Sequence, residues 1–173
     1  MVDMLLQAGA DVHAVDEQGC TPLHHACCIT NLPVVQTLLS HGADVNIRNV
    51  CGGTPLFSML MMSVKPSSIL PVVHLLCDHG ADVNSRDDIG LTPLLVLVLR
   101  YTSRYFSESS ILPIVKLLRN HGADPYLLCD EAGRNAVTLA EKIGWLEVLS
   151  VFKPCKFIYE GRREIWDLET YTT

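Results

Sequence analysis

Apolar residues recur along this chain with helical spacing, in short stretches that each open near a proline. One set of stretches starts at Thr-Pro, and its threonines are Thr21, Thr54 and Thr92. A threonine hydroxyl accepts a hydrogen bond from a free backbone N–H at a helix start, and proline suits the first helical position. The pattern therefore predicts a helix after each of these threonines.

A second set of apolar stretches follows about a dozen or more residues later and also carries a proline. The three prolines are Pro33, Pro71 and Pro113, and helical spacing continues to Leu39, Leu76 and Leu118. A second helix is predicted to begin at each proline. Each is expected to end at a glycine that tolerates a left-handed backbone, namely Gly42, Gly80 and Gly122. A short extended finger should join that glycine to the next Thr-Pro.

Two phrases recur in register along the chain. The first contains Gly-Ala-Asp at 9–11, 42–44, 80–82 and 122–124, and the second contains Thr-Pro-Leu at 21–23, 54–56 and 92–94, with a degenerate copy at 133–137. Thr21 and Thr54 stand 33 residues apart, and Thr21-Pro22-Leu23-His24-His25-Ala26 resembles the Thr-Pro-Leu-His-x-Ala signature of the ankyrin repeat family. The resemblance implies an all-α solenoid of stacked helix-turn-helix units with β-hairpin-like fingers.

The predicted array covers residues 1–153. It divides into a partial repeat (1–18), a repeat (19–51), two repeats with insertions (52–89 and 90–132) and a C-terminal capping repeat (133–153). Residues 154–173 do not repeat, and this tail is predicted to pack on the cap. A free peptide motif for a partner is the alternative.

The two insertions lie between the helices of their units. Thr54 to Thr92 spans 38 residues and Thr92 to Asn135 spans 43, and the excess falls near residues 63–68 and 101–110. Both segments are polar and are expected to form exposed loops. The preceding stretches, 57–64 and 94–101, are expected to lengthen the first helix by about a turn. The loops either form a second binding surface or are tolerated surface decoration.

The chain begins inside a repeat, because residues 2–6 match the end of a second helix. An apolar face would then be uncovered. We expect a fragment of a longer array or an end capped by something else, and a monomer once that end is covered. The N-terminus does not resemble a secretory signal, and the apolar run 94–99 is far too short to span a membrane.

Composition narrows the classes of partner and compartment. Apolar residues make up 49% of the chain, which is ample for a core. The formal charge of −6 and the lack of a dense basic run disfavour nucleic acid and favour a protein or peptide, such as one with a basic segment. Seven scattered cysteines, an odd number, predict reduced, buried thiols in a cytoplasmic or nuclear protein.

Finger tips are the first candidate binding residues, because ankyrin-like proteins usually recognise partners with fingers and concave inner-helix faces. The tip positions are Asp16, Glu17, Asn49, Val50, Asp87, Asp88, Asp130 and Glu131. Three of the four tips carry an acidic pair that would attract a Lys/Arg-rich segment. The alternative is that the first Asp belongs to the family pattern and the second serves solubility.

The concave face supplies the second set of candidates. By register, these are Cys28, Ile29, Met61, Met62, Leu99, Arg100 and Tyr101. A line of such side chains could receive apolar residues of a peptide, and methionine adapts to varied shapes. Core packing explains some of them equally well.

Catalytic, cofactor-binding and metal-binding residues are not predicted. His41, His79 and His121 each precede a helix-ending glycine, where a cation or donor suits the helix C-terminus. His24 is expected to form hydrogen bonds between repeats. The cluster of His74, Cys77 and His79 lacks a shared helix face for zinc. No phosphate-binding loop or hydrolase motif occurs, which disfavours an enzyme.

The sequence therefore predicts an intracellular adaptor or scaffold module that binds a protein through its fingers and concave face, as part of a larger protein. One alternative is the substrate-recognition part of a ubiquitin-ligase subunit, although the tail lacks a convincing ligase-recruiting box. Another is a structural or regulatory segment that packs against its own chain.

Overall fold

The computed structural model describes residues 1–62, 66–102, 107–128 and 134–152. Within these ranges every regular element is an α-helix. In chain order they are α1 (Val2–Gln7), α2 (Pro22–Cys28), α3 (Leu32–Ser40), α4 (Pro55–Met61), α5 (Pro66–Asp78), α6 (Pro93–Thr102), α7 (Glu108–Asn120), α8 (Ala136–Ile143) and α9 (Leu146–Phe152). None of these helices is long and apolar enough to cross a membrane.

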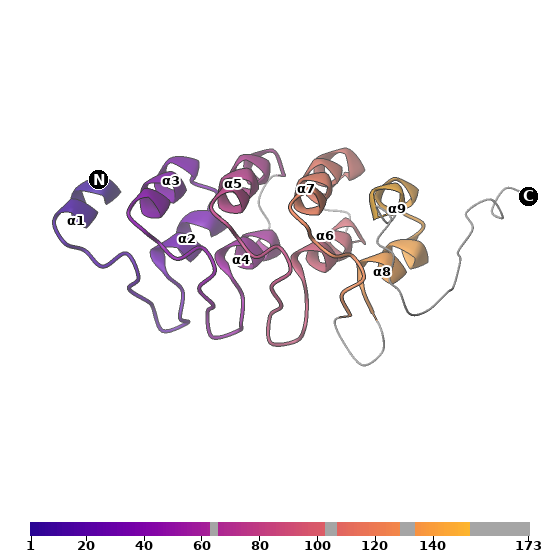
Figure 1. Ribbon diagram of the computed structural model, residues 1–173, viewed down its shortest axis with the longest axis horizontal. Coiled ribbons are helices and arrows are strands. Elements are labelled where there is room, and N and C mark those ends of the chain that lie inside the picture. The colour runs from indigo at the N-terminus through magenta and orange to yellow at the C-terminus, as the bar shows by residue number, and fades with distance from the viewer. Residues whose placement is uncertain (63–65, 103–106, 129–133, 153–173) are drawn as a thin grey trace, which may run out of the picture.

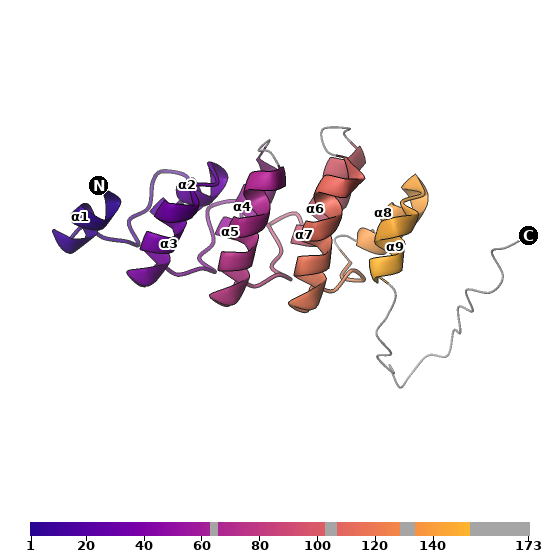
Figure 2. The ribbon, with the colours of Figure 1, turned by 90° about the horizontal axis from the view of Figure 1, so that it is seen from above.

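The helices form two layers along one axis, with α1 at one end and α9 at the other (Figure 1). We call α2, α4, α6 and α8 the inner helices, and α1, α3, α5, α7 and α9 the outer helices. Fingers project below the inner layer between successive units, whereas the connections from inner to outer helix lie along the other edge (Figure 2). Each helix packs against its partner and against the next helix of its layer, which makes the molecule a solenoid.

The inner helices begin where the sequence predicts. The hydroxyls of Thr21, Thr54 and Thr92 each accept a hydrogen bond from the backbone N–H three residues later, at 3.3–3.4 Å. In the last unit Asn135 replaces the threonine, and its side chain accepts from Thr138 N at 2.8 Å. A good N-cap thus survives where the Thr-Pro sequence is lost.

Two of the three outer-helix starts differ from the prediction. Pro33 lies in the first turn of α3, but α5 begins at Pro66 and α7 at Glu108, so Pro71 and Pro113 lie inside their helices. The additional turn of each helix buries an isoleucine, Ile69 or Ile111. The buried isoleucine offsets part of the cost of a proline inside the helix, which removes one backbone hydrogen bond and crowds the preceding turn.

The insertions are consequently only partly loops. Residues 66–68 belong to α5, residues 101–102 to α6 and residues 108–110 to α7, while residues 63–65 and 103–106 lie outside the described ranges. The predicted extra turn of the inner helix is confirmed in α6, which has 10 residues. It is wrong for α4, which has 7 residues and ends because Met62 adopts an extended backbone.

Glycines after the outer helices take the left-handed backbone that the sequence predicts. The φ angles of Gly42, Gly80 and Gly122 are 83°, 81° and 87°. Two asparagines then tie one unit to the next. Asn46 Nδ2 donates to Gly80 O at 3.0 Å while its Oδ1 accepts from Asp82 N at 2.7 Å. Asn84 makes the same pair of bonds to Gly122 O and Asp124 N.

One continuous core runs between the layers. Equivalent leucines of successive inner helices, Leu23, Leu56 and Leu94, are almost fully buried. At the C-terminal end of the array, Trp145 and Phe152 are also buried, and they close this core against α8 and α9. The tail that was predicted to pack there lies outside the described residues.

Candidate functional site

One side chain at the same place in each described finger folds the finger tip. Asp16 Oδ1 accepts from the backbone N–H groups of Gln18 and Cys20, Asn49 Oδ1 from Cys51 and Gly53, and Asp87 Oδ1 from Ile89 and Leu91, all at 2.8–3.2 Å. These acceptors satisfy donors that a tight turn leaves free. Asp16, Asn49 and Asp87 therefore hold the fingers in shape.

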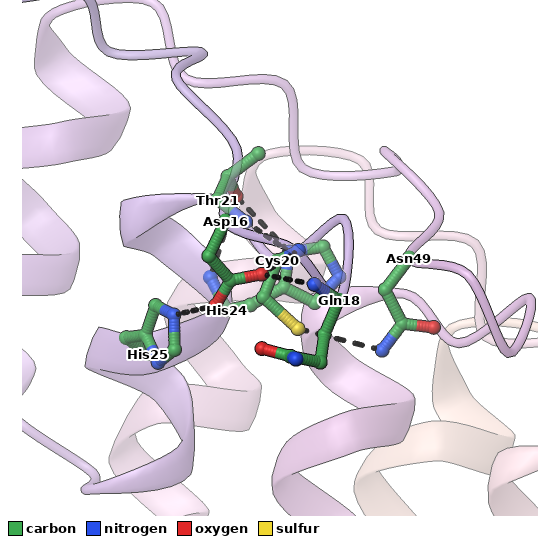
Figure 3. Close-up of polar contacts among 7 residues, drawn as sticks. All are labelled: Asp16, Gln18, Cys20, Thr21, His24, His25 and Asn49. Carbon is green, nitrogen blue, oxygen red and sulfur yellow. Dashed lines mark hydrogen bonds and ion pairs between the residues drawn. The ribbon is translucent and has the colours of Figure 1, made fainter.

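Asp16 also reaches its own inner helix. Its Oδ2 lies 2.7 Å from His25 Nε2, on the exposed face of α2 (Figure 3). The Cys20 backbone N–H holds the pKa of the Asp16 carboxyl below its ordinary value, with further help from His25 and Gln18, although partial desolvation opposes them. The carboxylate is thus already engaged on both oxygens within its own repeat.

Neighbouring fingers are joined through their backbones. Val50 N donates to Gln18 O, and Asp88 N donates to Cys51 O, both at 3.0 Å. Gly52 sits at this junction with a left-handed φ of 75°, and a Cβ there would collide with the side chains of Arg48 and Asp88. The described fingers therefore form a linked edge, which recurrence of the phrases alone did not indicate.

Arginines lie beside one acidic pair of the finger tips and offset part of its negative charge. Glu17 and Asp88 are exposed, but Arg48 Nη2 lies 3.4 Å from Asp88 Oδ1, and Arg86 occupies the position equivalent to Arg48 in the next finger. These two arginines stand directly before the tip positions in the sequence, and the tip pairs alone do not reveal them. Val50 is 64% exposed, and Asp130 and Glu131 lie outside the described residues.

An exposed line of apolar side chains marks the C-terminal ends of three inner helices. We define the apolar row as Ile29, Met61, Met62 and Leu99, whose exposed fractions are 68%, 52%, 48% and 40%. Met61 and Leu99 stand seven residues beyond the N-caps of their helices, and Ile29 and Met62 stand eight, so the four occupy two adjacent positions of the stacked units. All four are among the candidates that the repeat register placed on the concave face, and the stacking brings them onto one edge of the inner layer.

Arg100 and Tyr101, also predicted to face a partner, have contacts inside the array. The Arg100 guanidinium donates to the carbonyl oxygens of Leu60 and Met62 and so completes the C-terminal end of α4 from the next repeat. The Tyr101 ring stacks on Trp145 with centroids 3.9 Å apart and an interplanar angle of 13°. Trp145 Nε1 also donates to Glu108 Oε1.

These contacts connect the third repeat to the cap. The sequence did not indicate Trp145 as the partner of Tyr101 and Glu108, because it stands 44 and 37 residues from them. The one available signal was a tryptophan in a unit otherwise reduced in its motifs. Arg100 and Tyr101 thus serve packing between repeats in this structure.

His24 joins two repeats, as its place in the repeat pattern predicts. Its Nδ1 accepts from Thr21 N at 3.2 Å, and its Nε2 donates to Gly53 O at 3.1 Å. Burial lowers the pKa of this imidazole, which matches a neutral ring with one donor and one acceptor nitrogen. Within the described residues, no three His, Cys, Asp or Glu side chains gather as a metal site would require.

Cysteines divide between the core and the surface. Cys27 and Cys77 are buried, as predicted, and burial raises the pKa of both thiols, that of Cys77 to about 11. Cys51 departs from the prediction because it lies exposed on a finger tip. Each of the five cysteines in the described ranges is a free thiol.

Known proteins share this repeat and this arrangement of helices. A family model described as ankyrin repeats, three copies, matches residues 1–87. The crystal structure of an ankyrin repeat domain from Acinetobacter baumannii superposes with a TM-score of 0.73 at 30% identity, covering 86% of this chain and 71% of that one.

Curated relatives match over shorter stretches. An ankyrin repeat and LEM domain-containing protein 1 homolog from Caenorhabditis elegans is 52% identical over 50 residues, which is 29% of this chain and 7% of that protein. Human 2-5A-dependent ribonuclease is 40% identical over 67 residues, which is 38% of this chain and 9% of that protein. The chain thus spans less than a tenth of either relative.

The family model covers half of the 173 residues, and the solved domain extends the likeness over most of the array. Ankyrin repeats are generally non-catalytic protein–protein interaction modules. The chain belongs to the ankyrin repeat family.

Proposed function

We propose that this chain is an adaptor or scaffold module that binds a partner protein through its inner helices and finger tips. The observation that carries the proposal is the apolar row. Four large apolar side chains stay 40–68% exposed at two adjacent positions of three stacked helices, next to a continuous core. A contiguous exposed apolar surface on a folded domain marks an interaction site.

Finger tips add a polar part to this surface. Glu17 and Asp88 project from fingers whose shape is held by Asp16 and Asp87, so the charged groups sit on a fixed support. A partner with a Lys/Arg segment would gain association rate and specificity from them more than raw affinity. Because Arg48 already pairs with Asp88, Glu17 is the stronger attractor of the two.

The free thiols favour an intracellular, cytoplasmic or nuclear, setting for this module. Disulfides are rare in those compartments, and five cysteines of the described ranges are unpaired. Cys51 in particular is exposed on a finger, where an oxidising compartment would leave it open to intermolecular pairing.

A capture experiment with matched variants tests the proposal. The double variant Met61→Gln/Met62→Gln removes the centre of the apolar row, and Leu146→Gln is the control because Leu146 is 77% exposed on the cap and outside the row. Proteins captured from a cell extract would be quantified by mass spectrometry for each variant and the unmodified chain.

We expect proteins that the unmodified chain and Leu146→Gln both retain to be lost from the double variant. The variant Glu17→Lys should weaken capture of the most basic of them. If the double variant retains the same proteins at the same level, the inner-helix surface is not the binding site and the proposal fails.

A further inference from the structure

We propose that the apolar row is built for an extended, polyproline II-like segment that carries an apolar residue at every third position and an acidic residue one step beyond. This inference rests on the proposed function and names the chemistry of the partner. Four observations carry it: the spacing of the units, the line of exposed apolar side chains, the polar end of that line and the closed ends of the helices.

The row repeats with the spacing of the inner helices. Packed helices stand about 8–10 Å apart, so Met61 and Leu99, which share one position in neighbouring units, are offset by about that distance along the stack. A partner that lies along the stack must present apolar side chains with the same period.

Polyproline II geometry supplies that period. It has three residues per turn and rises about 3.1 Å per residue, so every third side chain returns to the same face after about 9 Å. A β-strand returns after two residues, about 6.6 Å, and falls out of step within two units. An amphipathic α-helix places apolar residues about 5 Å apart, so alternate residues would fall between the helices of the array.

Methionine at the centre of the row suits such a ligand. Met61 and Met62 are both about half exposed, and an unbranched thioether adjusts to side chains of different shape. The polyproline II conformation is also largely formed before binding, so little ordering entropy opposes the contact with a shallow row.

The row changes character at its C-terminal end. Seven residues beyond their N-caps, α4 and α6 present Met61 and Leu99, whereas α8 presents Lys142. Lys142 is exposed, and no carboxylate in the described part of the chain forms an ion pair with it. A ligand with three apolar residues over α2, α4 and α6 would therefore place its next inward-facing residue over a cation, which favours Asp or Glu there.

The carbonyl oxygens at the end of α4 already have a donor, so a ligand on the row does not need to supply backbone N–H groups to them. Arg100 already donates to the carbonyl oxygens of Leu60 and Met62 at the end of α4. Contacts with the ligand therefore rest on apolar side chains and on the single charge at α8.

Synthetic peptides test the spacing directly. The probe is a fluorescein-labelled decapeptide with Leu at positions 1, 4 and 7, Glu at position 10, and Pro, Gln or Ser elsewhere, together with its reversed sequence because the chain direction is free. The first control has the same composition with Leu at positions 1, 3 and 5, and the second is an amphipathic helical peptide of equal apolar content. Fluorescence anisotropy gives the dissociation constants.

We expect the probe or its reverse to bind at least tenfold more tightly than both controls. Met61→Gln should weaken it about tenfold, which corresponds to losing the burial of one methionine side chain. Lys142→Glu should weaken the probe and have no effect on a version with Gln in place of its Glu. Leu146→Gln is the matched control, and circular dichroism should show equal helix content in all variants.

Equal or tighter binding of either control peptide, no binding of any peptide, or insensitivity of the probe to both Met61→Gln and Lys142→Glu overturns the inference. Those results leave the proposed function standing if the double variant at Met61 and Met62 still loses its captured proteins. If capture is unaffected as well, both proposals fail together.

Discussion

The finger edge and the loop edge of this array follow opposite rules. Along the finger edge, Asp16, Asn49 and Asp87 make the same two backbone hydrogen bonds in unit after unit. Along the loop edge, where inner helices turn into outer helices, α4 has 7 residues and α6 has 10, and among the described residues a Trp–Tyr stack, Trp145 on Tyr101, joins only the last two units. The contacts that repeat are therefore those that fix the backbone of the fingers. The connections that vary between units are free to take on other roles.

The loop edge should yield the largest loss of stability. Trp145→Ala removes a nearly fully buried indole together with its stack on Tyr101 and its bond to Glu108. We expect a loss of about 3–5 kcal/mol, as for other buried aromatic truncations, from urea unfolding followed by circular dichroism. Leu146→Ala, next in sequence but 77% exposed, should change stability by less than about 0.5 kcal/mol. Similar losses for both would show that the Trp145 contacts do not hold the cap.

The finger edge should show a clear split between two adjacent aspartates. Asp87→Ala leaves the N–H groups of Ile89 and Leu91 without their acceptor and should cost about 1–2 kcal/mol. Asp88→Ala removes only an exposed pair with Arg48 and should cost less than about 0.5 kcal/mol. Thermal unfolding of both variants checks this, and a reversed order would contradict the role of the first Asp in the turn.

A gain of stability is expected in the connection from α2 to α3, residues 29–31. Thr30 has a φ of 51°, a left-handed backbone that is strained for a β-branched residue, in the turn between α2 and α3. Thr30→Gly should stabilise the chain by about 0.5–1 kcal/mol, since relief of strain exceeds the added freedom of the unfolded glycine. Thr30→Ala keeps the strain and serves as the control; an equal gain in both variants would point to another cause.

The smallest effect is a pH dependence that belongs to the junction of the first two complete repeats. Burial lowers the pKa of His24, so as pH falls the unfolded chain takes up this proton before the folded chain does. The contribution is fully present above the ordinary histidine pKa of about 6.5 and declines as pH falls from there toward the lowered value. Urea unfolding between pH 7.5 and 5 should show a smaller slope for His24→Asn than for the unmodified chain, and identical slopes would contradict it.

Sequence reasoning recovered most of the fold because repeat signals are local. Helix starts are predicted by the capping hydroxyls of Thr21, Thr54 and Thr92. Helix ends are predicted by glycines that adopt a left-handed backbone, Gly42, Gly80 and Gly122. It failed at Pro71 and Pro113, since local preference places proline first in a helix whereas burial of Ile69 and Ile111 extends each helix past it. Tertiary packing decided those starts.

The candidate site was predictable to the same depth. Register placed Ile29, Met61 and Met62 on one edge, because stacked units keep matching positions in line. It gave no warning that Arg100 reaches back to the end of α4 or that Tyr101 stacks on Trp145, since those contacts join residues 38–44 positions apart. The prediction of an acidic edge also left out Arg48 and Arg86. Both stand next to the tip positions in the sequence, so they could have been predicted.

The two asparagine ties described above recur at successive junctions of the array. Asn46 and Asn84 bridge successive units with the same pair of distances, although the intervening chain lengths differ. They stand six residues beyond the ends of α3 and α5, whereas the insertions lie between α4 and α5 and between α6 and α7. The contact between these units thus does not depend on the length of the connection between their helices. Insertions can lengthen that connection without changing how one unit is placed on the next.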